Sequence, residues 1–307
     1  MNAAKFGRIG DFEALLKIWN SQEKAKFQSC KELNQCESGS MTNRPVLRWH
    51  GGKSKLANWI IQHLPAHRCY VEPYSGAASV LMQKGRSRAE IYNDLDSEVV
   101  NVFRILRDRG PELLRLVELT PFSRSDFDLC YEATEDPLEK ARRMLVRAAF
   151  GRASASATSP WKASFRSYSG AARTTTAAQD WANFPQALND FTRRLAGVVI
   201  ENKDALELMK EHDSKDSLFY VDPPYVASTR DLAQDYRHEM TEDQHESLAD
   251  ALKSLKGMVV LSGYRCELYD RLYQGWERVD HHAHADGASQ RIESLWLSPN
   301  VPTGRLL

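Results

Sequence analysis

Apolar residues follow two patterns along this chain, short runs that are typical of buried strands and longer stretches with helical spacing. The short runs predict strands at 70–71, 89–92, 198–201, 218–221, 258–261, 276–282 and 292–297, and one more from 46 toward Gly51. Helical spacing predicts helices at 56–64, from 77, at 98–115, from 125, at 137–150, 183–195, 204–212, 244–255 and 267–273. Their alternation predicts an α/β fold with a mostly parallel sheet and an antiparallel C-terminal hairpin.

Residues 1–43 follow a different pattern. Phe6, Ile9 and Phe12 begin an amphipathic helical pattern, and the chain then turns polar as far as Asn43. We expect an appended helix and linker here. The alternatives are a docking segment for a partner and a start of the functional unit at Met41.

Composition excludes several classes of protein. The chain has 41 basic and 41 acidic residues, so no overall positive charge argues for nucleic acid. Its five cysteines form no Cys-x-x-Cys pair, which favours a reducing cytoplasm over a disulfide framework or a zinc site. No apolar run approaches the roughly 20 residues that span a bilayer, and no signal-peptide pattern opens the chain. We therefore expect a cytoplasmic protein without a membrane segment.

Two glycine-containing turns lie at predicted strand ends. Gly51-Gly-Lys precedes a helix and suits an anionic group, although an ordinary turn explains it equally well. The second turn, around Gly76, follows a strand, and Asp94 ends the next strand. Nucleoside cofactors are bound by this arrangement, in which the carboxylate binds ribose hydroxyls. The Gly-x-Gly-x-x-Gly spacing is absent, which argues against a nicotinamide cofactor.

Asp222-Pro-Pro-Tyr ends the apolar run 218–221. Each proline fixes its own φ, and Pro224 restricts Pro223 as well, so the loop is stiff and holds the Asp222 carboxylate and the Tyr225 ring in place. Open α/β sheets bind ligands at such strand ends. Taken alone, the four residues are also consistent with a simple strand stop.

Positive charge is concentrated between Lys140 and Gln179, where eight Lys or Arg residues occur without any Asp or Glu. This segment predicts contact with a phosphate backbone, and a solvated surface insertion is the alternative. The predicted DNA contacts are Arg152, Lys162, Arg166 and Arg173. His281, His282 and His284 lack the accompanying cysteines or paired acids of a metal site, so we expect no metal.

Four stretches together resemble the Dam-type DNA adenine-N6 methyltransferases, the D12 class, α group. They begin at Arg48 (Arg-Trp-His-Gly-Gly-Lys-Ser-Lys), Val71 (Val-Glu-Pro-Tyr-Ser-Gly-Ala-Ala-Ser), Ile91 (Ile-Tyr-Asn-Asp) and Val221 (Val-Asp-Pro-Pro-Tyr), in the family's order. The resemblance covers residues 45–300. It implies a class I S-adenosylmethionine-dependent methyltransferase fold, Rossmann-like, with a small helical target-recognition insert. The expected domains are an extension at 1–43, a catalytic domain at 44–110 and 183–307, and the insert at 111–182.

The resemblance implies methyl transfer from S-adenosylmethionine to N6 of an adenine that is flipped out of double-stranded DNA. Asp222, Pro223 and Tyr225 are the implied catalytic residues. The implied cofactor-binding residues are Trp49, Lys53, Glu72, Tyr74, Gly76, Asp94, Asp204 and Asp222. Two positions depart from the family pattern, Tyr74 for Phe and Ala78 for Gly, and both keep size and shape.

Other functions stay open at this point. An N4-cytosine or RNA amino-methyltransferase would use the same fold, although Asp222 favours adenine, because Ser or Asn usually replaces it there. A non-catalytic DNA-binding protein is the third possibility, and the intact Asp222-Pro-Pro-Tyr stretch argues against it. We expect a monomer that binds double-stranded DNA.

Overall fold

The computed structural model describes residues 45–49, 51–152, 154–157, 162–167, 175–229, 237–284 and 290–302. All of them belong to one unit, residues 42–307. The predicted N-terminal helix and linker, and Arg173, lie outside the described residues.

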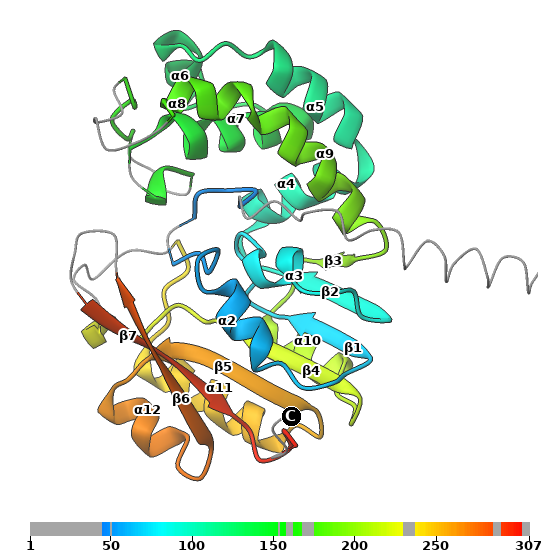
Figure 1. Cartoon of the computed structure of the whole chain (residues 1–307), viewed down its shortest axis with the longest axis vertical. Coiled ribbons are helices and arrows are strands. Elements are labelled where there is room, and N and C mark those ends of the chain that lie inside the picture. The colour runs from blue at the N-terminus through cyan, green and yellow to red at the C-terminus, as the bar shows by residue number, and fades with distance from the viewer. Residues whose placement is uncertain are drawn as a thin grey trace, which may run out of the picture. The chain divides into compact units, whose positions relative to one another are not determined.

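Seven strands form one sheet, in the order β3-β2-β1-β4-β5-β7-β6. The strands are β1 (Cys69–Glu72), β2 (Ala89–Asn93), β3 (Val199–Glu201), β4 (Ser217–Val221), β5 (Met258–Tyr264), β6 (Glu277–His284) and β7 (Gln290–Leu297). The first five strands run parallel, and β7 lies antiparallel between β5 and β6. The predicted parallel sheet with an antiparallel C-terminal hairpin is therefore confirmed (Figure 1).

Helices cover both faces of the sheet. The helices are α2 (Ala57–Gln62), α3 (Ser79–Gln83), α4 (Ser97–Asp108), α5 (Gly110–Leu119), α6 (Arg124–Leu129), α7 (Pro137–Phe150), α8 (Ala177–Ala182), α9 (Phe184–Leu195), α10 (Ala205–Glu211), α11 (Glu242–Ser254) and α12 (Glu267–Leu272), with short 3-10 turns at Ser154–Ala157 and Ala227–Thr229. Helices α4–α9 all lie between β2 and β3 in the chain, and in Figure 1 α5–α9 gather above the β3 edge of the sheet.

Strand β4 shows how the two faces are packed. All five of its residues are buried, because it lies between β1 and β5 with helices on either side. Leu218 and Tyr220 join the cluster that contains residues of α2–α9, whereas Phe219 and Val221 join the cluster that contains residues of α10–α12. This alternation is the period of two that a strand imposes on its side chains, and it explains why the strand is a continuous apolar run.

Two expectations from the sequence were wrong. Residues 45–49 form no strand, and Val46 and Leu47 are apolar because they pack into the core as an irregular segment. The helix expected over 98–115 is broken at Arg109, where α4 ends and α5 begins. Pro111 lies in the first turn of α5, where its missing N–H costs nothing, whereas within one continuous helix it would clash with the preceding turn.

Candidate active site

The candidate site lies where the strand order of the sheet reverses. From β1 the chain proceeds outward to β2 and β3 on one side, and β4 and β5 follow on the other side of β1. Ligands of open α/β sheets bind at this switch point, outside the carboxyl ends of the strands. The two strands at the switch point end in Glu72-Pro-Tyr and Asp222-Pro-Pro, the loops that the sequence singled out.

One cavity at this edge brings the predicted residues together. It is lined by every residue assigned to the cofactor, Trp49, Lys53, Glu72, Tyr74, Gly76, Asp94, Asp204 and Asp222, and also by Pro223. Asp204 is in addition the N-cap of α10, where its carboxylate accepts hydrogen bonds from two backbone N–H groups, of Leu206 and Glu207. That capping bond fixes the orientation of the Asp204 side chain.

The glycine turn is held by contacts on both sides. Gly76 has φ +47°, and its N–H donates to Asp94 Oδ2 at 2.8 Å. A Cβ at this position would meet Nε1 of Trp49 at 2.7 Å. The turn therefore requires a residue without a side chain, for its backbone angle and for the close approach of Trp49.

We expect Gly76→Ala to lower the free energy of unfolding by about 2 kcal/mol, because an L side chain is strained in this backbone region and meets Trp49. Chemical denaturation measures the change. Gly85→Ala is the matched control, since a Cβ there meets nothing within 4 Å and Gly85 has no positive φ. Equal stabilities of the two variants would contradict the assignment of the turn.

Burial changes the acid–base behaviour of two acids in the cavity. It raises the pKa of Glu72 to about 8, against the opposing hydrogen bond from the Tyr70 hydroxyl. Burial also raises the pKa of Asp94 to about 6, although two backbone N–H groups, of Asp96 and Gly76, donate to its carboxylate. The cavity therefore contains carboxyl groups whose charge a cationic ligand would favour.

Asp222 is held through both of its carboxylate oxygens. Oδ1 accepts a hydrogen bond from Ser262 Oγ at 2.7 Å, and Oδ2 lies 2.9 Å from Lys53 Nζ. Ser262, on β5, is itself hydrogen-bonded to Tyr220 of β4. These contacts fix the rotamer of Asp222 and leave its remaining lone pairs for a ligand.

Tyr225 lies beside the cavity without lining it. Its side chain is buried, its hydroxyl donates to Glu293, and Lys53 Nζ lies 4.7 Å from the centre of its ring. Tyr264 packs edge-on against the same ring. The burial of Tyr225 and its hydrogen bond to Glu293 were not foreseen from the sequence.

Sequence reasoning missed several polar residues of the site. Ser262 and Glu293 lie in strands that looked like plain apolar elements, and nothing in their local pattern marks them. Ser79 and Asp96 line the cavity, and each has a buried oxygen, Oγ and Oδ2, without a hydrogen-bond partner among the described residues. Asp96 could have been found as the second acid of Asn93-Asp-Leu-Asp, at the start of a helix.

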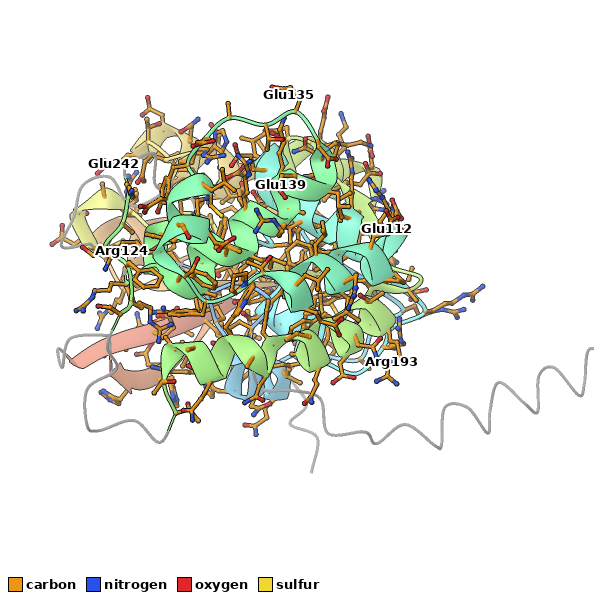
Figure 2. All side chains as sticks on the ribbon, turned by 90° about the horizontal axis from the view of Figure 1, so that it is seen from above. Glu112, Arg124, Glu135, Glu139, Arg193 and Glu242 are labelled. Carbon is orange, nitrogen blue, oxygen red and sulfur yellow. The ribbon has the colours of Figure 1, made fainter. Side chains whose placement is uncertain are left out.

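The insert separates the basic residues into two groups. Lys140, Arg142, Arg143 and Arg147 form ion pairs with acids that lie outside the 140–179 window in sequence, Glu135, Glu139 and Glu98. Acids also lie among the outer helices, where Figure 2 shows Glu112, Glu135 and Glu139. These four of the eight basic residues are therefore paired with acids within the fold.

The second group surrounds a shallow hollow. Arg152 and Lys162 line it together with Arg124, which lies at the edge of the helical layer in Figure 2. Lys162 also pairs with Asp128 at 2.7 Å. Arg166 is placed elsewhere, donating to the carbonyl of Ala149. Phe165, an aromatic residue within the basic segment, packs against Phe122, Phe127 and Phe150.

His281 stacks on Trp59, with ring centroids 4.8 Å apart. Across the described ranges, no group of three or more potential metal ligands comes together. None of the helices in these ranges is long and apolar enough to cross a bilayer.

Comparison with known proteins identifies the family. The model of the D12 class N6 adenine-specific DNA methyltransferases matches residues 49–285. The chain belongs to this family. The match favours adenine in DNA over the cytosine, RNA and non-catalytic alternatives.

Individual family members are similar over different lengths. A DNA adenine methylase of Salmonella typhi is 25% identical over 257 residues, which cover 76% of this chain and 84% of that protein. The Escherichia coli K12 DNA adenine methylase is 26% identical over 231 residues, or 69% and 77% of the two chains. One from Serratia marcescens is 35% identical over 108 residues, 34% of this chain and 40% of that protein. The family match and these similarities confirm the resemblance seen in the motifs.

Proposed function

We propose that this family member transfers a methyl group from S-adenosylmethionine to N6 of an adenine flipped out of double-stranded DNA. The observation that carries the proposal is the meeting of Asp222-Pro-Pro with the Gly76 turn in one cavity at the switch point of the sheet. Membership of the family indicates the reaction. The cavity brings the Gly76 turn and Asp94, an arrangement that binds nucleosides, together with Asp222, a hydrogen-bond acceptor that is held in place.

The residues of the cavity fit this cofactor. Its acids suit a ligand with a positive sulfonium and amino group, and Ser79 Oγ and Asp96 Oδ2 are buried oxygens available to a polar ligand. Asp94 would bind the ribose hydroxyls, and Asp204 the adenine end. Trp49, Glu72, Tyr74 and Gly76 would line the methionine and sulfonium region. When bound, the cofactor supplies an electrophilic methyl group.

The family resemblance implies Lys53 as a cofactor-binding residue, with the methionine carboxylate as the group that its charge suits. The structure places its ammonium between Asp222 and Glu293, at 2.9 and 3.6 Å. We therefore propose that Lys53 serves the catalytic loop, where its charge offsets the cost of burying Glu293 fully and Asp222 partly.

Asp222 and the Pro223 carbonyl would accept hydrogen bonds from the adenine amino group. Those bonds localise the nitrogen lone pair, which is otherwise delocalised into the ring, and they stabilise the positive charge that develops on N6. Because Ser262 and the two prolines hold these acceptors in place, little reorganisation accompanies the transfer. Tyr225 would stack on the flipped base in place of its present contact with Lys53, a kind of contact worth about 1–3 kcal/mol in single-stranded systems.

The proposal is tested by expressing the protein in a host without adenine methylation and mapping modified bases across its genome. N6-methyladenine in a defined sequence context is the expected result. Incorporation of label from S-adenosylmethionine by the purified protein tests the cofactor. Modified cytosines, or no modification by soluble protein, would contradict the proposal.

We propose the hollow of Arg124, Arg152 and Lys162 as a DNA-backbone contact, with Arg166 and Arg173 in the same insert as the further contacts expected from the sequence. The triple change of Arg124, Arg152 and Lys162 to alanine is expected to weaken DNA binding and to flatten the plot of log affinity against log salt by about one unit per lost phosphate contact. Arg193, at the opposite side of the layer in Figure 2, provides the control variant Arg193→Ala. An unchanged slope in the triple variant would make this hollow an ordinary surface.

A further inference from the structure

Glu293 is a buried acid to which neither the motifs nor the proposed mechanism gives a role. It lies on β7, opposite Tyr264 of β5 and His281 of β6, and is 4% exposed. Burying a carboxylate costs several kcal/mol unless its oxygens are paired. An apolar residue would pack equally well at this buried position. The polar partners of Glu293 therefore indicate what its carboxylate does.

Those partners are two residues of the catalytic centre. The Tyr225 hydroxyl donates to Glu293 Oε1, and Lys53 Nζ lies 3.6 Å from the same oxygen. Lys53 also pairs with Asp222 and lies over the Tyr225 ring. Glu293 thus contacts both the Tyr225 hydroxyl and the Lys53 ammonium, and Lys53 in turn pairs with Asp222.

The charges of this cluster decide how strong an acceptor Asp222 can be. With Glu293 ionised, one lysine faces two carboxylates, and the cluster carries a net negative charge beside the place where positive charge develops. Without Glu293, Lys53 would pair with Asp222 alone and would neutralise the charge of its carboxylate. Burial raises the pKa of Glu293 overall, while the neighbouring Lys53 ammonium and the hydrogen bond from the Tyr225 hydroxyl oppose that rise and favour the ionised form.

We propose that Glu293 is a positioning residue for methyl transfer, which fixes the Tyr225 ring and shares Lys53 with Asp222 so that Asp222 remains a strong hydrogen-bond acceptor. The inference rests on the proposed function. It assigns to β7, inserted between β5 and β6, a direct part in organising the catalytic loop.

The test compares Glu293→Gln with Glu293→Ala in the full-length protein. The assay is single-turnover methylation of a duplex that contains the mapped target adenine, with cofactor affinity measured separately by calorimetry. Gln keeps an acceptor for the Tyr225 hydroxyl and removes only the charge, so we expect a loss of about tenfold in rate. Ala removes both contacts, and about a hundredfold loss is expected. Cofactor affinity should stay within about twofold in both variants.

Glu90→Gln is the matched control. Glu90 is an equally buried acid, paired with Lys84 and Arg194 away from the cavity, so its loss should lower stability without slowing the single-turnover step. A wild-type rate for Glu293→Gln, or cofactor affinity lost in parallel with rate in both Glu293 variants, would overturn the proposal. No methylation by the wild-type protein would overturn the proposed function itself, which separates the two failures.

Discussion

Replacing Asp222 by alanine is expected to lower the rate of methyl transfer by about a thousandfold, the upper part of the range for removing one preorganised hydrogen-bonding group from an active site. The fold should remain intact, because Asp222 lies at a strand tip and Lys53 keeps Glu293 as a second partner. Methyl incorporation into DNA measures the first effect, and thermal unfolding measures the second.

Two variants sharpen this experiment. Asp222→Asn keeps the size of the side chain and can still accept from Ser262, so its inactivity would show that charge is needed. Asp216→Ala changes an exposed acid just before the opposite end of the same strand and should leave the rate unchanged. Near-wild-type methylation by Asp222→Ala would contradict the assignment of the loop.

Replacing Lys53 by alanine is expected to remove activity and to lower the free energy of unfolding by about 3–5 kcal/mol, because it leaves the buried Glu293 and the partly buried Asp222 without their shared cation. The loss in stability should be smaller in acid than at pH 8, because burial raises the pKa of Glu293 and its protonation relieves the repulsion. Denaturation at several pH values measures both effects.

Lys55→Ala is the control for this prediction, because Lys55 is an exposed lysine two residues away. Its stability and rate should match those of the wild-type protein. If Lys53→Ala were as stable as Lys55→Ala at pH 8, the ammonium would have no part in holding the two acids.

The sequence predicted those parts of the site that local chemistry determines. Strand ends, the positive-φ glycine turn and the proline corner depend on residues that are adjacent in the chain, so their patterns are visible without a structure. The place of the cavity could be predicted because parallel strands bring their carboxyl ends to one edge. Lys53 could be assigned to the site in this way, but its partners could not.

The site residues that the sequence did not reveal are placed by contacts between segments far apart in the chain. Glu293 reaches Tyr225 only because β7 is inserted between β5 and β6, a strand order that no local pattern specifies. The run at Val46 is apolar because it is buried in the core, and alternation cannot distinguish such a segment from a strand. Ala78 matched the family pattern in size, yet it adopts φ 53°, a left-handed conformation that glycine would adopt with less strain.

The position of the helical insert has a consequence for how such enzymes diversify. The chain leaves the sheet at the end of β2 and returns at β3, and these two strands are neighbours at its edge. Strands β1 and β4, whose carboxyl ends line the cavity, lie farther inside. Helices at the edge can therefore be lengthened, shortened or exchanged during evolution without altering the register of the inner strands. With the DNA contact proposed for the insert, a change of target sequence would then leave the geometry of the cavity untouched.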